Sequence, residues 1–91
     1  MVAKKRERLE VIQDILSCIM NHNNSIKPTR LLHSSNLSPQ MFKEYIDELK
    51  EKGFIQEKED SEKKEYSLTN KGFEYLEQYK TITRIIENFG L

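Results

Sequence analysis

The feature that most constrains this 91-residue chain is a series of helix-start and helix-stop residues between positions 25 and 72. Pro28 suits the first turn of a short helix, where a missing backbone N–H costs nothing. Ser38 followed by Pro39 predicts the start of a second helix, and Gly53 supplies the left-handed residue that ends it. Thr69 predicts the cap of a further helix. These signals divide the segment into two short helices, a hairpin and the start of another helix.

Apolar residues repeat at three- and four-residue intervals along the expected helices, which places them on one face of each. They are Leu9, Ile12, Ile15, Leu16 and Ile19 in a helix over 4–21, Leu31 and Leu32 in the short helix, and Phe42, Tyr45, Ile46 and Leu49 in the helix over 38–52. Leu37 is expected to fill the turn between the two short helices. Phe54–Ile55 and Tyr66–Leu68 predict two strands, and QEKEDSEKKE between them is expected to form the hairpin tip.

This order of elements predicts a mainly helical α+β fold, a winged helix-turn-helix with a two-stranded wing. Residues 1–76 are expected to form the winged domain and residues 69–91 a C-terminal dimerisation helix. In that helix Gly72, Tyr75, Tyr79, Ile82, Ile86 and Phe89 are spaced 3, 4, 3, 4 and 3 residues apart, as in a coiled-coil seam. Phe73 and Leu76 lie on another side and are expected to face the domain.

The seam predicts a homodimer whose interface is formed by Tyr75, Tyr79, Ile82, Ile86 and Phe89. The alternative is that these side chains fold back on the core of their own domain. Because the other helices already supply the apolar stripes that a small helical core needs, the intermolecular interpretation is favoured.

The composition limits the partners and the location of the chain. Fifteen basic and fifteen acidic residues give a formal net charge of zero, which counts against strong non-specific binding to nucleic acid. Cys18 is the single cysteine, so no intrachain disulfide is possible, and the helix stripe beside it predicts a small buried side chain. No apolar run approaches the roughly 20 residues that span a bilayer. The expected location is therefore the cytoplasm, in association with the nucleoid.

The quoted residues also carry a family resemblance. The pieces that match are Lys27, Thr29 to Leu32, Asn36-Leu37-Ser38, Tyr45 to Leu49, Lys52 to Ile55, Tyr66 to Thr69 and Lys71-Gly72, together with the heptads of the last helix. In these the chain resembles the small archaeal winged helix-turn-helix DNA-binding proteins, a class that includes abundant chromatin-type proteins. The resemblance implies a dimer joined by long C-terminal helices in an antiparallel coiled coil. It also implies that the helix over 38–52 of each protomer meets double-stranded DNA.

Four groups of residues are candidates for DNA contact. Ser38, Gln40 and Lys43 lie in the first turns of the expected recognition helix, where base contacts concentrate. Lys27, Thr29 and Arg30 lie at the start of the preceding helix, which suits a phosphate. Lys63 and Lys64 fall in the wing, and Lys4, Lys5 and Arg6 form a basic N-terminal cluster. The competing interpretation of each group is an ordinary solvated surface.

No motif in the sequence predicts a catalytic site, a metal site or a bound cofactor. His22, His33 and Cys18 lack metal-ligand spacing, and no glycine-rich loop precedes a Lys-Ser/Thr pair. The chain is therefore expected to be a DNA-binding transcriptional regulator rather than an enzyme. Three alternatives remain: an architectural chromatin-type protein, a winged-helix docking module for another protein, and a sensor with a ligand against Tyr75 and Tyr79.

Overall fold

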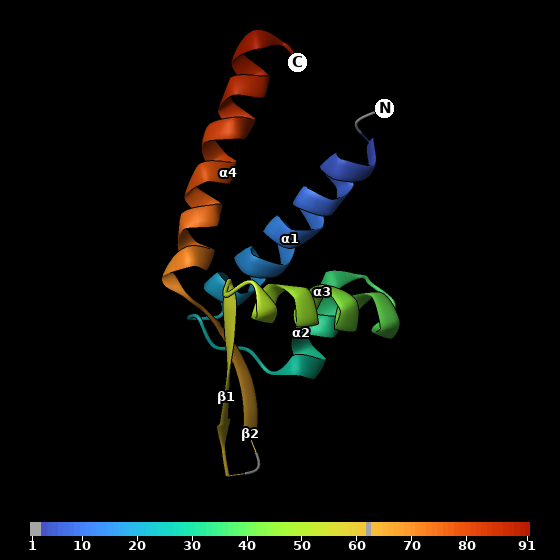
Figure 1. The fold of residues 1–91 in the computed structure, drawn as a ribbon, viewed down its shortest axis with the longest axis vertical. Helices are drawn as coiled ribbons and strands as arrows, with labels where there is room; N and C mark the ends of the chain where they lie inside the picture. The colour runs from blue at the N-terminus through green and yellow to red at the C-terminus, as the bar shows by residue number, and fades with distance from the viewer. Residues whose placement is uncertain (1–2, 62) are drawn as a thin grey trace.

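A computed structural model describes the backbone of residues 3–61 and 63–91, and the side chains of residues 8–61 and 63–91. It confirms the predicted fold class, with the elements in the order α1, α2, α3, β1, β2 and α4 (Figure 1). Their bounds are Ala3–Asn21 for α1, Pro28–Ser35 for α2, Pro39–Glu51 for α3, Ile55–Asp60 for β1, Lys63–Leu68 for β2 and Asn70–Phe89 for α4. The molecule measures 50 × 26 × 21 Å, with the β-hairpin at one end of the long axis and the C-terminal end of α4 at the other.

The core lies where the three N-terminal helices meet the base of the hairpin. The residues that α1 contributes are the predicted stripe from Ile12 to Ile19, and Leu31, Ile46 and Leu49 close over it from α2 and α3. Ile26 joins the hairpin through two backbone bonds with Tyr66, at 3.1 and 2.9 Å, and so forms an isolated bridge beside the two-stranded sheet. All of these side chains are buried, which makes burial of apolar surface the main stabilising contribution to the domain.

The helix boundaries follow the predicted capping residues. Ser38 Oγ accepts a hydrogen bond from the Met41 N–H at 3.2 Å, and Thr69 Oγ accepts one from the Gly72 N–H at 3.2 Å. Each bond satisfies one of the backbone donors that have no partner inside the first turn of a helix. Gly53 adopts a left-handed φ of 79°, and beyond it Phe54 N–H returns to the Leu49 carbonyl oxygen at 2.9 Å. This geometry ends α3 and aims the chain into β1.

The hairpin differs from the prediction. QEKEDSEKKE was expected to form the tip, but β1 continues to Asp60 and β2 begins at Lys63, so most of this stretch is paired strand. The register explains the difference, since it places Lys58 opposite Glu65, Glu59 opposite Lys64, and Asp60 opposite Lys63. Opposite charges that face each other across two strands stabilise their pairing. Residues with low strand propensity therefore form a charge-matched wing.

Helix α4 leaves the domain after its first two turns. Gly72 and Leu76 are buried against the hairpin base, and a Cβ at Gly72 would overlap the Phe54 carbonyl oxygen. Phe73 was expected to face the domain, but 38% of its surface is exposed, so only the Leu76 half of that prediction holds. Farther along, α1 and α4 diverge, and both chain termini lie at the end opposite the wing (Figure 1).

Candidate nucleic-acid interface

Helix α3 presents one continuous exposed face. The exposed residues of α3 are Pro39, Gln40, Met41, Lys43, Glu44, Asp47 and Glu51. At 3.6 residues per turn, Gln40, Glu44, Asp47 and Glu51 lie along the line opposite the buried Phe42, Ile46 and Leu49. Lys43 lies at the edge of this line, on the side of the wing. The face therefore carries one lysine against three carboxylates.

Lys43 is engaged within its own helix. Its Nζ lies 2.9 Å from Asp47 Oδ2, and 77% and 53% of the two side chains are exposed. The hydrogen bond from Lys43 is the main reason why the pKa of Asp47 lies below its ordinary value. A pair this exposed is worth little in water, so Lys43 can exchange Asp47 for a phosphate or a base at small cost.

The hydroxyl of Ser38 has a structural role. Its oxygen accepts the capping bond from Met41, and Pro39 occupies the first helical position behind it. Ser38 is nevertheless exposed and keeps its hydroxyl proton for a further partner. It therefore stays a candidate contact, while its position is determined by the cap.

The start of α2 carries cations that have no partner among the described residues. Lys27 occupies the N-cap position and makes no side-chain cap, while Thr29 and Arg30 are exposed in the first turn. Leu31 N–H makes the first bond of the helix, to the Lys27 carbonyl oxygen at 3.0 Å, so the N–H groups of Thr29 and Arg30 precede it. Amide donors and two cations at a helix N-terminus match the requirements of a phosphate.

The wing lysines are largely neutralised by the wing itself. Glu57 Oε1 lies 3.1 Å from Lys50 Nζ of α3 and 3.3 Å from Lys64 Nζ, so one carboxylate serves two cations. The hydrogen bond from Lys50 is the largest cause of the lowered pKa of Glu57. Lys63 is exposed and lies opposite Asp60 in the register. The predicted wing contacts therefore start from charges that already have partners or close neighbours of opposite sign.

At the N-terminus, the side chains of Lys4, Lys5 and Arg6 lie outside the described residues. Arg8 is described, and its guanidinium pairs with the Glu48 carboxylate of α3 while lying 5.8 Å from the centre of the Tyr45 ring. Glu48 also accepts a bond from Lys52 Nζ at 2.8 Å. This link between α1 and α3 was not predicted from the sequence, because no local signal pairs residues forty positions apart.

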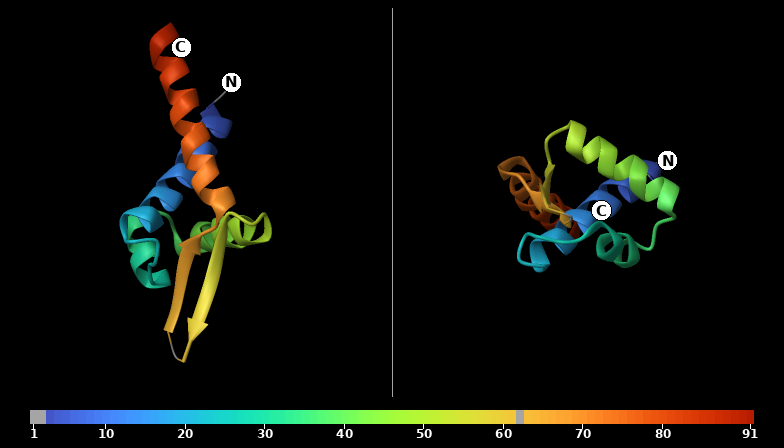
Figure 2. Two further views of the ribbon diagram at one scale, coloured as in Figure 1. Left: turned by 90° about the vertical axis from the view of Figure 1, so that its left-hand side faces the viewer. Right: turned by 90° about the horizontal axis from the view of Figure 1, so that it is seen from below.

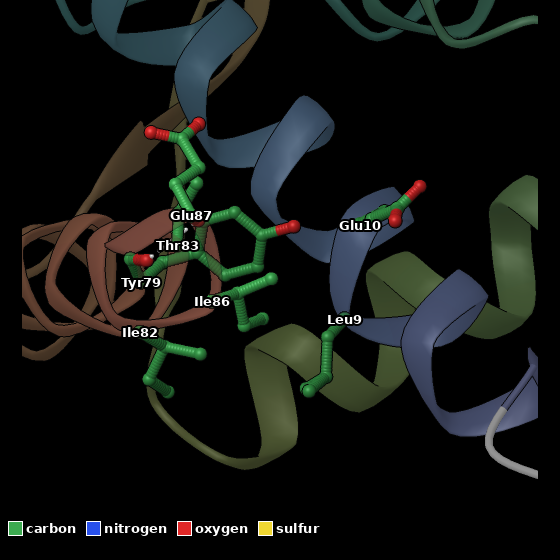
Figure 3. A pocket seen from close by; sticks show the side chains of 7 residues that line it. All are labelled: Leu9, Glu10, Tyr79, Ile82, Thr83, Ile86 and Glu87. Carbon is green, nitrogen blue, oxygen red and sulfur yellow. Dashed lines mark hydrogen bonds between the residues drawn. The ribbon is translucent and has the colours of Figure 1, made fainter. Parts of the chain in front are cut away.

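Three of the predicted dimer residues, Tyr79, Ile82 and Ile86, line a groove between α1 and α4. Leu9 and Glu10 of α1 and Tyr79, Ile82 and Ile86 of α4 line a cavity of about 250 Å³, with Leu9 on one side and the α4 residues on the other (Figure 3). Ile82 and Phe89 are 50% and 74% exposed, and Ile85 and Leu91 beside them are exposed as well. The far half of α4 therefore carries apolar side chains that the rest of the domain leaves exposed.

Tyr75 differs from the rest of that set. Its hydroxyl donates to the Leu9 carbonyl oxygen at 3.0 Å, and its ring meets Phe54 edge-on at a centroid distance of 5.7 Å. Burial, with a smaller contribution from Tyr79, raises the pKa of Tyr75 to about 12. For this residue the structure supports the alternative that it folds back on its own domain.

The remaining polar side chains of interest do not form a reactive site. Cys18 is half-buried against the core, and its Sγ lies 4.0 Å from His22 Nδ1. Among the described residues, no three histidine, cysteine or carboxylate side chains are grouped as a metal ion requires. None of the helices in the described part of the chain has the length and apolar character needed to cross a bilayer.

When the molecule is seen from the wing end, the hairpin, α2 and α3 lie on the near side and the far half of α4 points away from them (Figure 2, right). The hairpin, α2 and α3 thus lie at one end of the molecule. The apolar surface of α4 occupies the other end.

Two solved structures share this architecture. Sso10a-2, a DNA-binding protein from Sulfolobus solfataricus, superimposes with a TM-score of 0.72 at 25% sequence identity, over 89% of this chain and 82% of that one. F93 from STIV, a winged-helix DNA-binding protein, superimposes with a TM-score of 0.71 at 19% identity, over 92% of this chain and 90% of that one. No curated protein matches the sequence.

The family comparison agrees with the fold. A family model described as winged helix-turn-helix matches residues 5–87, which is nearly the whole chain. The match includes α2, α3, the wing and most of α4. The chain therefore belongs to the winged helix-turn-helix family.

Proposed function

We propose that this chain binds double-stranded DNA by placing α3, the helix predicted over 38–52, in the major groove. The observation that carries the proposal is the exposed face of α3, together with the exposed N-terminus of α2, in a winged helix-turn-helix. The similarity to Sso10a-2, whose described role is DNA binding, supports it. A recognition helix in the major groove with its partner helix against the backbone is the usual docking mode of this motif.

The proposed contacts form two groups: contacts to phosphates, which would position the protein on the duplex, and contacts to bases, which would recognise the sequence. Lys27, Thr29 and Arg30 would hold a phosphate at the start of α2, because cations without a local partner lie there beside unused N–H groups. Ser38, Gln40 and Lys43 would meet base edges from the first turns of α3. A glutamine amide can bond adenine N6 and N7, and a lysine can reach guanine or a phosphate.

Two other predicted groups have supporting roles in this proposal. Lys63 and Lys64 would add little affinity, because carboxylates across the hairpin already offset their positive charges. Lys4, Lys5 and Arg6 would lie along the DNA backbone and contribute to salt-dependent affinity. The principal affinity is assigned to Arg30, Lys27 and Lys43.

The local charges favour a transcriptional regulator over a protein that coats DNA. Sequence-independent binding depends on many unpaired cations along the phosphate path. The net charge is zero, and Lys43, Lys50, Lys52 and Lys64 are all paired with carboxylates. A sequence-specific regulator needs fewer phosphate contacts and uses base contacts for the rest of its affinity.

The test is fluorescence anisotropy with a labelled duplex of random sequence across a salt series, with wild type compared with an Arg30→Glu, Lys43→Glu variant. A Lys80→Glu, Arg84→Glu variant makes the same charge change on exposed positions of α4 and serves as the control. We expect affinity that falls with salt, is lost in the first variant and is kept in the control. Equal binding by both variants would assign the affinity to net charge and not to α3.

We further propose that the chain acts as a homodimer joined by α4. When two copies of α4 run antiparallel around residue 84, Tyr79 lies opposite Phe89 and Ile82 lies opposite Ile86. The four residues then map onto themselves, as an interface with a twofold axis requires. The exposure of Ile82, Ile85 and Phe89 supports this pairing, and so does the apolar groove beside them. The far part of the 69–91 helix is thus assigned to dimerisation.

Disulfide trapping tests both the dimer and its orientation, in a Cys18→Ser background that removes the native thiol. We expect Tyr79→Cys and Phe89→Cys chains to form a covalent dimer when mixed under oxidation, while neither forms one rapidly alone. Rapid crosslinking of each single variant with itself would show parallel helices instead. Arg84→Cys, on the side of α4 opposite the seam, is the control and should stay reduced.

One observation favours a second function, docking to another protein. The outward line of α3 carries Glu44, Asp47 and Glu51, and Met41 is 47% exposed beside it. A basic and partly apolar protein surface would fit this face. Absence of binding to every duplex in the anisotropy series and in a selection from random sequences would favour this function over DNA binding.

A further inference from the structure

The part of α3 that would enter deepest into a groove contains hydrogen-bond acceptors and no cation. Gln40 and Glu44 are one turn apart at the centre of the exposed face, and Asp47 and Glu51 continue the same line. Lys43 lies at the edge and is engaged by Asp47 at 2.9 Å. Glu44 is exposed and has no hydrogen bond or ion pair among the described residues. Among the exposed side chains in the first two turns of the helix, its carboxylate is therefore an unengaged group that only accepts hydrogen bonds.

A carboxylate in the major groove distinguishes between bases by what it cannot bind. An ionised carboxylate only accepts hydrogen bonds. The donors on base edges in that groove are cytosine N4 and adenine N6, whereas guanine and thymine present O6, N7 and O4 as acceptors. When a carboxylate loses water and meets another acceptor, its desolvation has no compensation. Such a side chain discriminates chiefly by penalising the wrong partner.

We propose that Glu44 is a specificity-determining residue, which selects a base carrying a major-groove amino group, cytosine or adenine, next to the base met by Gln40. The inference rests on the proposed function, because it requires α3 to lie in the major groove. It also gives a role to the acidic recognition face. Repulsion between the carboxylates and the phosphates lowers affinity for all sequences, and binding to the correct bases recovers it.

The experiment is selection of binding sites from a library of random duplexes, with the full chain as wild type, Glu44→Gln, Glu44→Ala and Glu51→Gln. Glu51 lies on the same exposed line at the C-terminal end of α3, so Glu51→Gln removes one negative charge without changing the first two turns. Affinity of each variant for the selected site and for a random duplex is then measured at one salt concentration.

We expect the wild-type site to contain a cytosine or adenine whose replacement weakens binding by about tenfold, the scale of one good base contact. Glu44→Gln and Glu44→Ala should lose that preference, because glutamine accepts and donates and alanine does neither. Glu51→Gln should keep the preference while binding every duplex somewhat more tightly, since it removes only a repulsive charge.

The outcomes separate this inference from the proposed function. If wild type enriches a site but the Glu44 variants keep every base preference, Glu44 does not read DNA, while the proposed DNA binding stands. If Glu44→Gln and Glu51→Gln change binding identically, only charge matters and the inference is overturned. If wild type binds every duplex equally, the inference fails and the proposed DNA binding stands. If wild type binds no duplex, both the inference and the proposed function fail.

Discussion

At the scale of single residues, Thr69 joins more parts of the domain than any other capping residue described. Its hydroxyl accepts a bond from the Gly72 N–H and donates one to the Gly53 carbonyl oxygen, and its own N–H bonds the Phe54 carbonyl oxygen at 3.1 Å. One side chain thus begins α4 and ties it to the end of α3. The sequence predicted the cap, but the bond to Gly53 depends on tertiary structure.

Thr69→Ala should therefore lower the free energy of unfolding by about 1–2 kcal/mol, the upper part of the range for loss of an N-cap. Urea unfolding followed by circular dichroism measures the change. Thr81→Ala, which removes a hydroxyl from an exposed position inside α4, should change stability by less than about 0.5 kcal/mol. Equal effects of the two substitutions would contradict the role assigned to Thr69.

At the scale of elements, α3 is held by an ion-pair network on each side. Glu48 connects it to Arg8 of α1, and Glu57 connects Lys50 of α3 to Lys64 of the wing. Hydrogen bonds from Lys52 and Arg8 lower the pKa of Glu48 from its ordinary value of 4.5. A carboxyl group whose pKa is lower in the folded state stabilises that state above its unfolded pKa. The contribution is lost as the pH falls through the folded pKa.

We expect the free energy of unfolding of wild type to decrease as the pH falls below about 4.5. Glu48→Gln should be less stable at neutral pH and should show a shallower decrease, because one of the groups that gain protons on unfolding is gone. Urea titrations at a series of pH values measure both quantities. The matched control is Glu74→Gln on the exposed side of α4, which should reproduce the wild-type slope.

The predicted elements also show what sequence reasoning missed. Helix boundaries were predicted because Ser38, Gly53 and Thr69 act within a few residues of themselves. The length of the hairpin was not, because Glu59 and Lys64 favour a strand only when each lies opposite the other. Tyr75 was assigned to the seam because helical spacing reports a face and not what covers that face. The candidate DNA residues of α2, α3 and the wing are exposed, as expected. The pairing of Lys43 with Asp47, which the sequence analysis did not predict, determines how readily Lys43 is available for DNA.

At the scale of the whole molecule, the two ends have different surfaces. The hairpin lies at one end with α2 and α3 beside it, and the far half of α4, which carries exposed apolar residues, lies at the other (Figure 1). A dimer formed at the second end would leave the first end of each copy free. Two sites on one assembly bind a duplex far more tightly than one, because the second contact becomes intramolecular.

An Ile82→Glu, Phe89→Glu variant should be monomeric and still folded, because both side chains are largely exposed in the single chain and charges resist burial in an interface. Sedimentation velocity should show a dimer for wild type and a monomer for the variant. Affinity for a selected duplex should fall by about 100-fold or more with the loss of the second site. Thr81→Glu, Asn88→Glu adds the same charge elsewhere on α4 and should stay dimeric.

The contact at Gly72 makes α4 a lever whose pivot lies against the Phe54 carbonyl oxygen. About 17 residues follow the pivot, so at a rise of 1.5 Å per residue the arm is about 26 Å long. A side chain that tilted the arm by about 10° would move its end by about 4–5 Å, more than the 3.4 Å between successive base pairs. In a dimer joined at the end of the arm, the size of residue 72 would thus determine how many base pairs separate the two half-sites.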